Sequence, residues 1–153
     1  MKSSLARWFV RRFSPKWTVG ALGVVRDERG KVLLLEHRWR EKPWGLPGGF
    51  VAWPESPEAG LVREFREEVG LALQASDFRL VKLLRSEKLP LIEAVYEHGP
   101  RLAPKCTSSL KLQASEVKTT RWCDAHDIAT REGLLDRHRG LLLELLAPAV
   151  GRA

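Results

Sequence analysis

The chain has 153 residues, of which 44% are hydrophobic and 29% are charged, and its formal net charge is +7 at pH 7. These values indicate one folded domain and exclude a chain that is disordered as a whole. No segment approaches the roughly 20 apolar residues that span a bilayer, and the N-terminus lacks the continuous apolar centre of a signal peptide. We therefore expect a soluble cytoplasmic protein without stable membrane insertion.

Residues 1–14 differ from the rest of the chain, which we expect to form a single domain over residues 15–153. The first sixteen residues include five basic side chains and no acid. Four apolar residues fall near helical spacing and the arginines lie largely on the other side, which predicts a basic amphipathic helix with the apolar stripe Leu5, Trp8, Phe9 and Phe13. Docking on the domain, or on a second subunit of a homodimer, is favoured over binding to a membrane surface.

Two strands are predicted next, over residues 17–25 and 31–37, and they are separated by a turn at residues 27–30. Together they predict a hairpin. Glu36 and Arg38 stand at its exit, where they either face a substrate or form an exposed strand end. We take Arg38 as a candidate substrate-binding residue.

Residues 39–53 are rich in turn-forming residues, and Gly48 and Gly49 would let the backbone approach a metal or a phosphate closely. Trp39, Trp44 and Trp53 lie in this segment and would flank such a site. Each is a candidate for stacking on a base, although an aromatic residue in a short α/β domain more often packs in the core.

A helix is predicted over residues 56–69, because Ser56 can cap its start, Pro57 suits its first turn, and Gly70 can take the left-handed conformation at its end. The interior glycine of this helix, Gly60, suggests that another group packs closely there. Three glutamates project from one face of the helix, namely Glu64, Glu67 and Glu68.

These three carboxylates are spaced at i, i+3 and i+4, where like charges repel each other by roughly 0.2–0.5 kcal/mol per pair. A solvated acidic face is the simpler interpretation. A divalent cation would remove the repulsion, since Mg²⁺ takes oxygen ligands and keeps waters and substrate phosphates in its shell. The spacing therefore favours a metal site.

The segment 49–71 resembles the signature of the Nudix hydrolase family, G-x5-E-x7-R-E-U-x-E-E-x-G-U, where U is a bulky apolar residue. Every fixed position is present: Gly49, Glu55, Arg63, Glu64, Glu67, Glu68 and Gly70. Phe65 stands where the family usually has an aliphatic residue, which affects packing beneath the helix and no ligand.

The resemblance implies an α/β fold, a Nudix-type α/β/α sandwich with a mixed central sheet and a catalytic loop-helix-loop. It also implies Mg²⁺ or Mn²⁺, with Glu64, Glu67, Glu68 and the Gly48 carbonyl as metal ligands. Glu64 is then the base that takes a proton from the attacking water. Glu55 would lie near the metal shell, and Arg63 would orient its acidic neighbours.

After this signature, strands are predicted over residues 78–85, 91–96 and 119–123, and an apolar helix over 134–146 should cover the sheet. Residues 99–115 form a long loop with weak periodicity. Loops of this length are often functional, and Lys105 in this loop is a candidate phosphate-binding residue.

One more metal-site carboxylate is expected from the late part of the chain, because related Nudix enzymes often supply a glutamate from a late loop. Glu116 is the candidate, since it lies just ahead of the Trp-containing strand. A solvated loop glutamate is the competing interpretation of Glu116. Glu87, Glu93 and Glu97 are less favoured positions for this carboxylate.

The resemblance implies hydrolysis of a phosphoanhydride bond in a nucleoside diphosphate linked to a group X, with a nucleoside triphosphate, an oxidised one included, or a nucleotide sugar as substrate. A pyrophosphohydrolase acting on RNA 5′ ends would reconcile catalysis with the basic charge. Two further functions compete with hydrolysis, namely a non-catalytic nucleotide-sensing module and a nucleic-acid-binding protein. The complete set of carboxylates disfavours the sensing module, and the confinement of much of the basic excess to the leader disfavours the nucleic-acid-binding protein.

Overall fold

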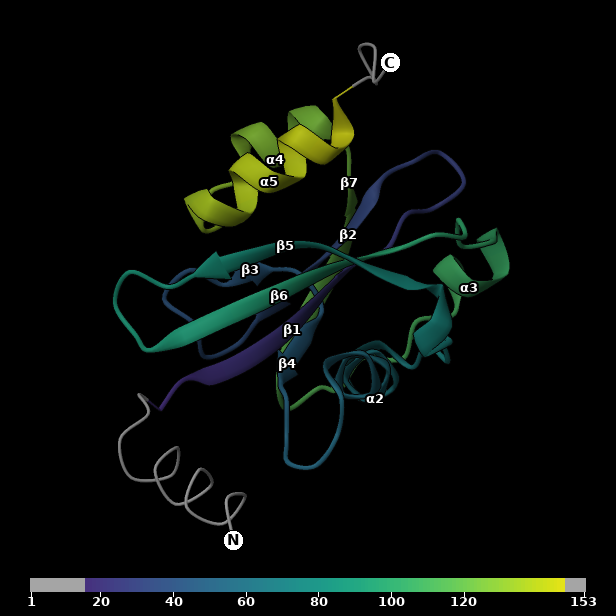
Figure 1. Ribbon diagram of the computed structural model, residues 1–153. Coiled ribbons are helices and arrows are strands. Elements are labelled where there is room, and N and C mark those ends of the chain that lie inside the picture. The colour runs from purple at the N-terminus through teal and green to yellow at the C-terminus, as the bar shows by residue number, and fades with distance from the viewer. Residues whose placement is uncertain (1–15, 148–153) are drawn as a thin grey trace, which may run out of the picture.

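The computed structural model describes residues 16–147, and the predicted N-terminal helix at residues 1–14 lies outside this range. Four strands precede the first helix in the described residues, and the later strands and helices are interspersed (Figure 1). In order, the elements are β1 (Thr18–Val24), β2 (Val32–His37), β3 (Trp44–Gly45), β4 (Gly48–Phe50), α2 (Pro57–Val69), the 3-10 turn η1 (Ala75–Asp77), β5 (Phe78–Arg85), β6 (Leu91–His98), α3 (Pro104–Ser108), β7 (Val117–Cys123), α4 (Ala125–Thr130) and α5 (Asp136–Leu146).

The strands form two sheets. The larger sheet has the order β4-β1-β6-β5, in which β1 and β6 are parallel and the outer strands run antiparallel to their neighbours. The smaller sheet has the order β3-β2-β7 and is antiparallel throughout. The mixed central sheet expected from the sequence is thus confirmed, and a second sheet accompanies it.

Helices cover the sheets from two sides. Leu61, Phe65 and Val69 of α2 pack in a core cluster with residues of both sheets. A second cluster joins Ile128 of α4 and Leu142 of α5 to the other faces of β1, β2 and β6. In Figure 1, α4 and α5 lie on one side of the strands and α2 lies on the other. The layers are therefore α/β/α.

The expected hairpin between β1 and β2 is wrong. The two strands part after a single bridge between Arg26 and Val32 and then enter different sheets. Each is an interior strand with two other neighbours, β4 and β6 for β1, and β3 and β7 for β2. A strand whose two edges are already paired has no edge left for a hairpin partner.

The later strands lie close to their predicted ranges, and the structure adds short helices. Strand β5 has the predicted bounds, β6 continues to His98, and β7 begins at Val117. The loop predicted over 99–115 contains the short helix α3, and α4 was not predicted. Cys106 and Cys123 are both free thiols. Within residues 16–147, no helix is long and apolar enough to cross a membrane.

Candidate active site

Helix α2 presents the predicted carboxylates, and its two ends are capped as the sequence indicated. The Ser56 side chain accepts a hydrogen bond from the Ala59 amide at 3.2 Å, and Gly70 ends the helix with a φ of 72°. The apolar face buries Phe65, whose ring fills the space where a side chain at Gly23 would stand. The larger aromatic ring is accommodated because its neighbour is a glycine.

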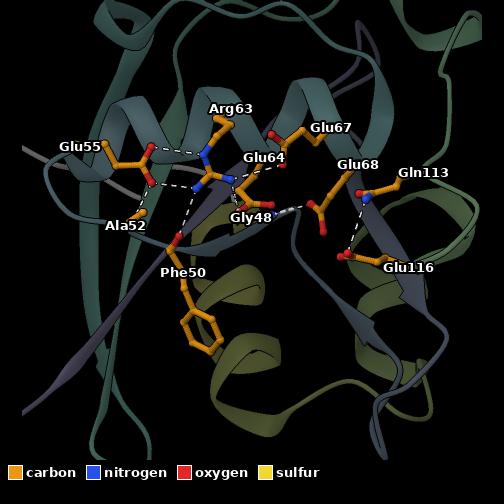
Figure 2. Close-up of polar contacts among 10 residues, drawn as sticks. All are labelled: Gly48, Phe50, Ala52, Glu55, Arg63, Glu64, Glu67, Glu68, Gln113 and Glu116. Atoms are coloured by element: carbon orange, nitrogen blue, oxygen red, sulfur yellow. Dashed lines mark hydrogen bonds and ion pairs between the residues drawn. The ribbon is translucent and has the colours of Figure 1, made fainter.

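Arg63 connects the carboxylates along this helix (Figure 2). Its guanidinium donates to Glu55 at 2.8 and 3.2 Å, to Glu64 at 2.7 Å and to Glu67 at 3.3 Å. It also donates to the Phe50 carbonyl at 3.2 Å, which holds the loop before α2. These bonds raise the pKa of Arg63, so one permanent cation serves three carboxylates.

Glu55 is held by two partners at the start of the helix. Arg63 is the main one, and the Ala52 amide donates to Glu55 Oε1 at 2.8 Å. Both hydrogen bonds lower the pKa of Glu55. The side chain also packs against Gly60, where a β-carbon would approach Glu55 Oε1 to 3.0 Å. This contact explains the glycine inside α2.

Glu68 is the most buried acid of the site, with only 2% of its surface exposed. The pKa of Glu68 is raised to about 8, mainly by burial and also by the nearby carboxylates of Glu64 and Glu116. The Gly48 amide, which donates to Oε2 at 2.8 Å, has the opposite effect on this pKa. A carboxylate held this way gains strongly from a cation beside it.

His37 does not supply that cation. Its Nδ1 lies 4.0 Å from Glu68 Oε1. Burial, with the positive charge of Arg40, lowers the pKa of His37 to about 4, so the ring is neutral at neutral pH. Because the His37 ring is neutral, its contact with Glu68 is not an ion pair, whether Glu68 is protonated or ionised.

A cavity of about 440 Å³ lies beside these residues and reaches from α2 to α5. Glu64, Glu68 and Glu116 line one end, and Figure 2 shows Glu68 and Glu116 directed toward the same space. Its whole lining consists of Gly20, Leu22, Arg40, Gly48, Gly49, Phe50, Glu64, Glu68, Leu91, Glu93, Glu116, Leu135 and His138.

The wall opposite α2 carries a separate ionic network. Arg137 donates to both oxygens of Glu93, at 2.8 and 3.0 Å, and His138 Nε2 lies 3.0 Å from Glu93 Oε2. Burial alone would raise the pKa of Glu93, but the hydrogen bonds of His138 and Arg137 outweigh it and lower the pKa to about 2. This network joins β6 to α5 across the cavity wall.

Of the residues expected at a metal site, Glu64, Glu68, Glu116 and Gly48 line one cavity. Glu67 is half exposed, is held by Arg63 and does not line the cavity. Gly48 contacts the site through its amide, and a β-carbon there would collide with the Ala21 carbonyl. Glu116 does line the cavity and accepts a weak hydrogen bond from Gln113 at 3.4 Å.

The four predicted substrate-binding residues do not line the cavity. Arg38 donates to the Ala114 carbonyl at 2.7 Å. Trp44 packs against the second core cluster with the Arg131 guanidinium 4.8 Å above its ring. Trp53 is 97% exposed on the loop before α2, and Lys105 lies on α3.

Arg40, Phe50, Glu93 and His138 line the cavity instead. Of these, only Glu93 was considered from the sequence, as a less favoured alternative to Glu116. Glu93 offered a signal, because a carboxylate inside the apolar strand LIEAVYEH needs a buried partner. Its partners, Arg137 and His138, follow more than forty residues later, and nothing local in the sequence connects them.

The chemistry of the cavity suits a hard divalent cation. Glu64, Glu68 and Glu116 offer only oxygen ligands, which Mg²⁺ and Mn²⁺ prefer. Among residues 16–147, no three acidic, histidine or cysteine side chains lie close enough together to hold a metal ion by themselves. A cation at Glu64, Glu68 and Glu116 would therefore need water and substrate oxygens among its ligands.

Comparisons with known proteins agree with the fold and the signature. The family model of the NUDIX domain matches residues 16–145. A "MutT-like protein" from Streptomyces ambofaciens is 26% identical over 117 residues, which are 76% of this chain and 70% of that protein.

Two solved structures are similar in fold. A MutT protein from Methanosarcina mazei Go1 has a TM-score of 0.67 at 24% identity, over 88% of this chain and 95% of that one. A MutT NUDIX hydrolase from Burkholderia pseudomallei has a TM-score of 0.69 at 23% identity, over 88% of this chain and all of that one. The predicted α/β/α sandwich is confirmed.

Proposed function

Because the chain belongs to the Nudix hydrolase family, whose members act on nucleoside diphosphate derivatives, we propose that it hydrolyses a phosphoanhydride bond of a nucleoside triphosphate, an oxidised one included, or of a nucleotide sugar. We propose Mg²⁺ or Mn²⁺ as its cofactor. The observation that carries this proposal is one cavity whose lining combines the carboxylates of Glu64, Glu68 and Glu116 with apolar side chains.

The two kinds of lining residue suit the two parts of such a substrate. The carboxylates, together with a divalent cation, match a pyrophosphate group. Leu22, Leu91 and Leu135 also line the cavity, with Phe50 64% exposed among the lining residues. Apolar and aromatic side chains of this kind bind the flat face of a base.

In this proposal Glu68 and Glu116 hold the metal together with Glu64. When bound, the metal neutralises pyrophosphate charge and lowers the pKa of a water. Glu64 Oε2 takes the proton of the attacking water, because Arg63 engages its other oxygen, Oε1. The bidentate pair between Arg63 and Glu55 holds the loop before α2 against this helix.

Arg40 replaces Arg38 as the substrate-side cation in this proposal. It lies in the lining of the cavity, and its positive charge lowers the pKa of both His37 and Glu68, so it is close to the acidic end. A guanidinium at that position would bind a phosphate oxygen.

A second candidate substrate is the triphosphorylated 5′ end of RNA. A neighbouring cavity of about 450 Å³ shares Arg40 and Leu135 with the first, and it is lined by the basic Lys42, Lys88 and Arg137 as well as by the acidic Glu41, Glu87 and Asp136. This continuation offers basic side chains to a substrate longer than one nucleotide. The two candidates differ in whether activity depends on this second cavity.

A release assay tests the proposal. Phosphate and pyrophosphate would be measured for nucleoside triphosphates, 8-oxo-nucleotides, nucleotide sugars and a triphosphorylated RNA oligomer, each with Mg²⁺, Mn²⁺ or EDTA. We expect metal-dependent release from at least one small nucleotide, and none from that substrate with Glu68→Gln. The exposed Glu132→Gln is the matched control.

Turnover that persists in EDTA would overturn the metal mechanism. Release from RNA alone, reduced by Lys88→Ala, would favour the second candidate. Binding of nucleotides without hydrolysis under any of these metals would favour a sensing module.

A further inference from the structure

One face of the larger sheet is only half covered by α2. On that side, β1, β6 and β5 carry Ala21, Ala94 and Phe78, which pack with α2 in a core cluster. Beside and beyond these covered residues, the side chains on this face are more open to solvent, and they are apolar except for the exposed Arg85, which is opposite Ile92. We call this part the open strip; it consists of Trp17, Val19, Leu80, Leu83 and Ile92.

The register places these residues on the same face as the covered ones. Val19 is opposite Ile92, and Leu83 is opposite Ala94, which is buried under α2. Side chains on a strand alternate between faces, so Val19 shares the face of Ala21, and Trp17 precedes Val19 by two residues. The open strip therefore crosses three neighbouring strands.

Four of the five side chains in this strip are exposed to solvent in the described residues 16–147, and Ile92 is partly buried. The exposed fractions are 61% for Leu83, 47% for Leu80, 43% for Trp17 and 37% for Val19. In Figure 1, α2 crosses one end of the sheet, while β1, β5 and β6 extend beyond it. A contiguous apolar face of this kind indicates a binding surface.

We propose that the chain's own residues 3–13 dock on the open strip as an amphipathic helix. Only three residues, 14–16, separate Phe13 from Trp17, so the segment leaves the sheet directly beside the strip. Its apolar side chains, Leu5, Trp8, Phe9 and Phe13, are spaced to form one helical face. The segment thus offers an apolar surface next to the open strip.

The dimensions agree. Eleven helical residues are about 16 Å long, and three adjacent strands span about 10 Å from the first axis to the third. A helix lying across β1, β6 and β5 would reach from the start of the chain's first strand to the edge of the sheet. Pro15 would end the helix and leave the backbone extended toward β1.

Charge argues against a second copy as the occupant. The edge strand β5 exposes Arg79, Lys82 and Arg85, so two copies meeting along this edge would bring like charges together. In the docked segment, Arg7 and Arg11 would lie away from the apolar stripe and face solvent. Arg12, four residues after Trp8 and seven after Leu5, would lie on the side of the stripe and extend past it to reach solvent.

Amide hydrogen exchange of the full-length protein tests this proposal. An isolated helix of eleven residues is marginal in water, so slow exchange at residues 3–13 requires docking. We expect Leu83→Asp to speed exchange of residues 3–13 at least about tenfold, and Trp8→Asp to do the same. Leu89→Asp is the matched control, because Leu89 is 62% exposed in the β5–β6 turn, outside the strip.

Each other outcome contradicts the proposal. Unprotected amides at residues 3–13 in the unmodified protein would exclude docking. Protection that is lost on dilution, together with a concentration-dependent sedimentation coefficient, would assign the strip to a second copy. Protection that arises only with anionic vesicles would assign the segment to a membrane surface. Protection equally sensitive to Leu89→Asp would show a contact elsewhere.

Discussion

The two walls of the active-site cavity both carry carboxylates bound by arginine, but their charge balance differs. On α2, one arginine serves Glu55, Glu64 and Glu67, and Glu68 receives only a backbone amide. On the opposite wall, Glu93 alone receives Arg137 and His138. The pKa of Glu68 is accordingly raised to about 8, and that of Glu93 is lowered to about 2.

This difference separates two uses of the same residue types. The wall with Glu93 has enough donors of its own and therefore stabilises the fold by connecting β6 to α5. The wall with Glu68 has more negative charge than its own cation can satisfy, which is the condition under which a divalent metal is bound. The comparison predicts that changes on the two walls will affect different measurements.

The largest effect is expected for Glu64→Gln on the α2 wall. If Glu64 is the base, this change should reduce kcat by about 10²–10⁴-fold, because the amide cannot take a proton from water. Single-turnover and steady-state rates with the best substrate would measure it. An unchanged rate would place the base elsewhere, and a lower melting temperature would show that Glu64 has a structural role as well.

On the opposite wall, Glu93→Gln should reduce stability. Breaking a buried pair costs about 3–5 kcal/mol, and because Arg137 is 28% exposed we expect about 2–3 kcal/mol. Urea unfolding would measure the change. The control is Glu36→Gln, whose partner Lys118 is 58% exposed and for which about 0.5 kcal/mol is expected. Equal losses of unfolding free energy in both variants would show that the Glu93 network stabilises the fold no more than an exposed ion pair does.

The same network predicts a pH dependence of stability. The pKa of Glu93 lies at about 2 in the folded protein and near 4.5 when the residue is unperturbed. The stabilisation is therefore complete above about pH 4.5 and is lost as the pH falls toward 2. The free energy of unfolding should fall more steeply over this range in the unmodified protein than in Glu93→Gln. Parallel curves would contradict the assignment.

The smallest effect is expected for Glu116→Gln, which changes the exposed carboxylate contributed by the late loop. We expect at least about a tenfold loss in apparent Mg²⁺ affinity or in kcat. A Mg²⁺ titration of activity would measure it, with Glu87→Gln on the β5–β6 turn as the control. A loss in the control and none in Glu116→Gln would show that the late loop reaches the site by another residue.

Local signals in the sequence predicted helix α2 well, because Ser56, Pro57 and Gly70 act through hydrogen bonds and backbone angles within a few residues. The division into two sheets was not predicted, since the apolar strands β1 and β2 do not reveal which neighbours they pair with. Helix α4 was missed although Asp124 and Asp127 form a local capping box.

Residues that depend on distant partners were the hardest to predict. Arg38 was chosen for the substrate, but the chain after β2 places Arg40 at the cavity and Arg38 on the Ala114 carbonyl. Trp44 was a candidate for base stacking, but it lies against Arg131 in the second core cluster. These outcomes depend on tertiary packing, which residue spacing does not encode.

The central claim is that the α2 wall binds a divalent cation and that the opposite wall does not. Binding of Mn²⁺, followed by electron paramagnetic resonance without substrate, tests it most directly. We expect Glu68→Gln to weaken Mn²⁺ binding at least about tenfold, while Glu93→Gln leaves it within about twofold of the unmodified protein under conditions where both are folded. Equal Mn²⁺ affinity in Glu68→Gln and the unmodified protein, or a loss confined to Glu93→Gln, would contradict the claim.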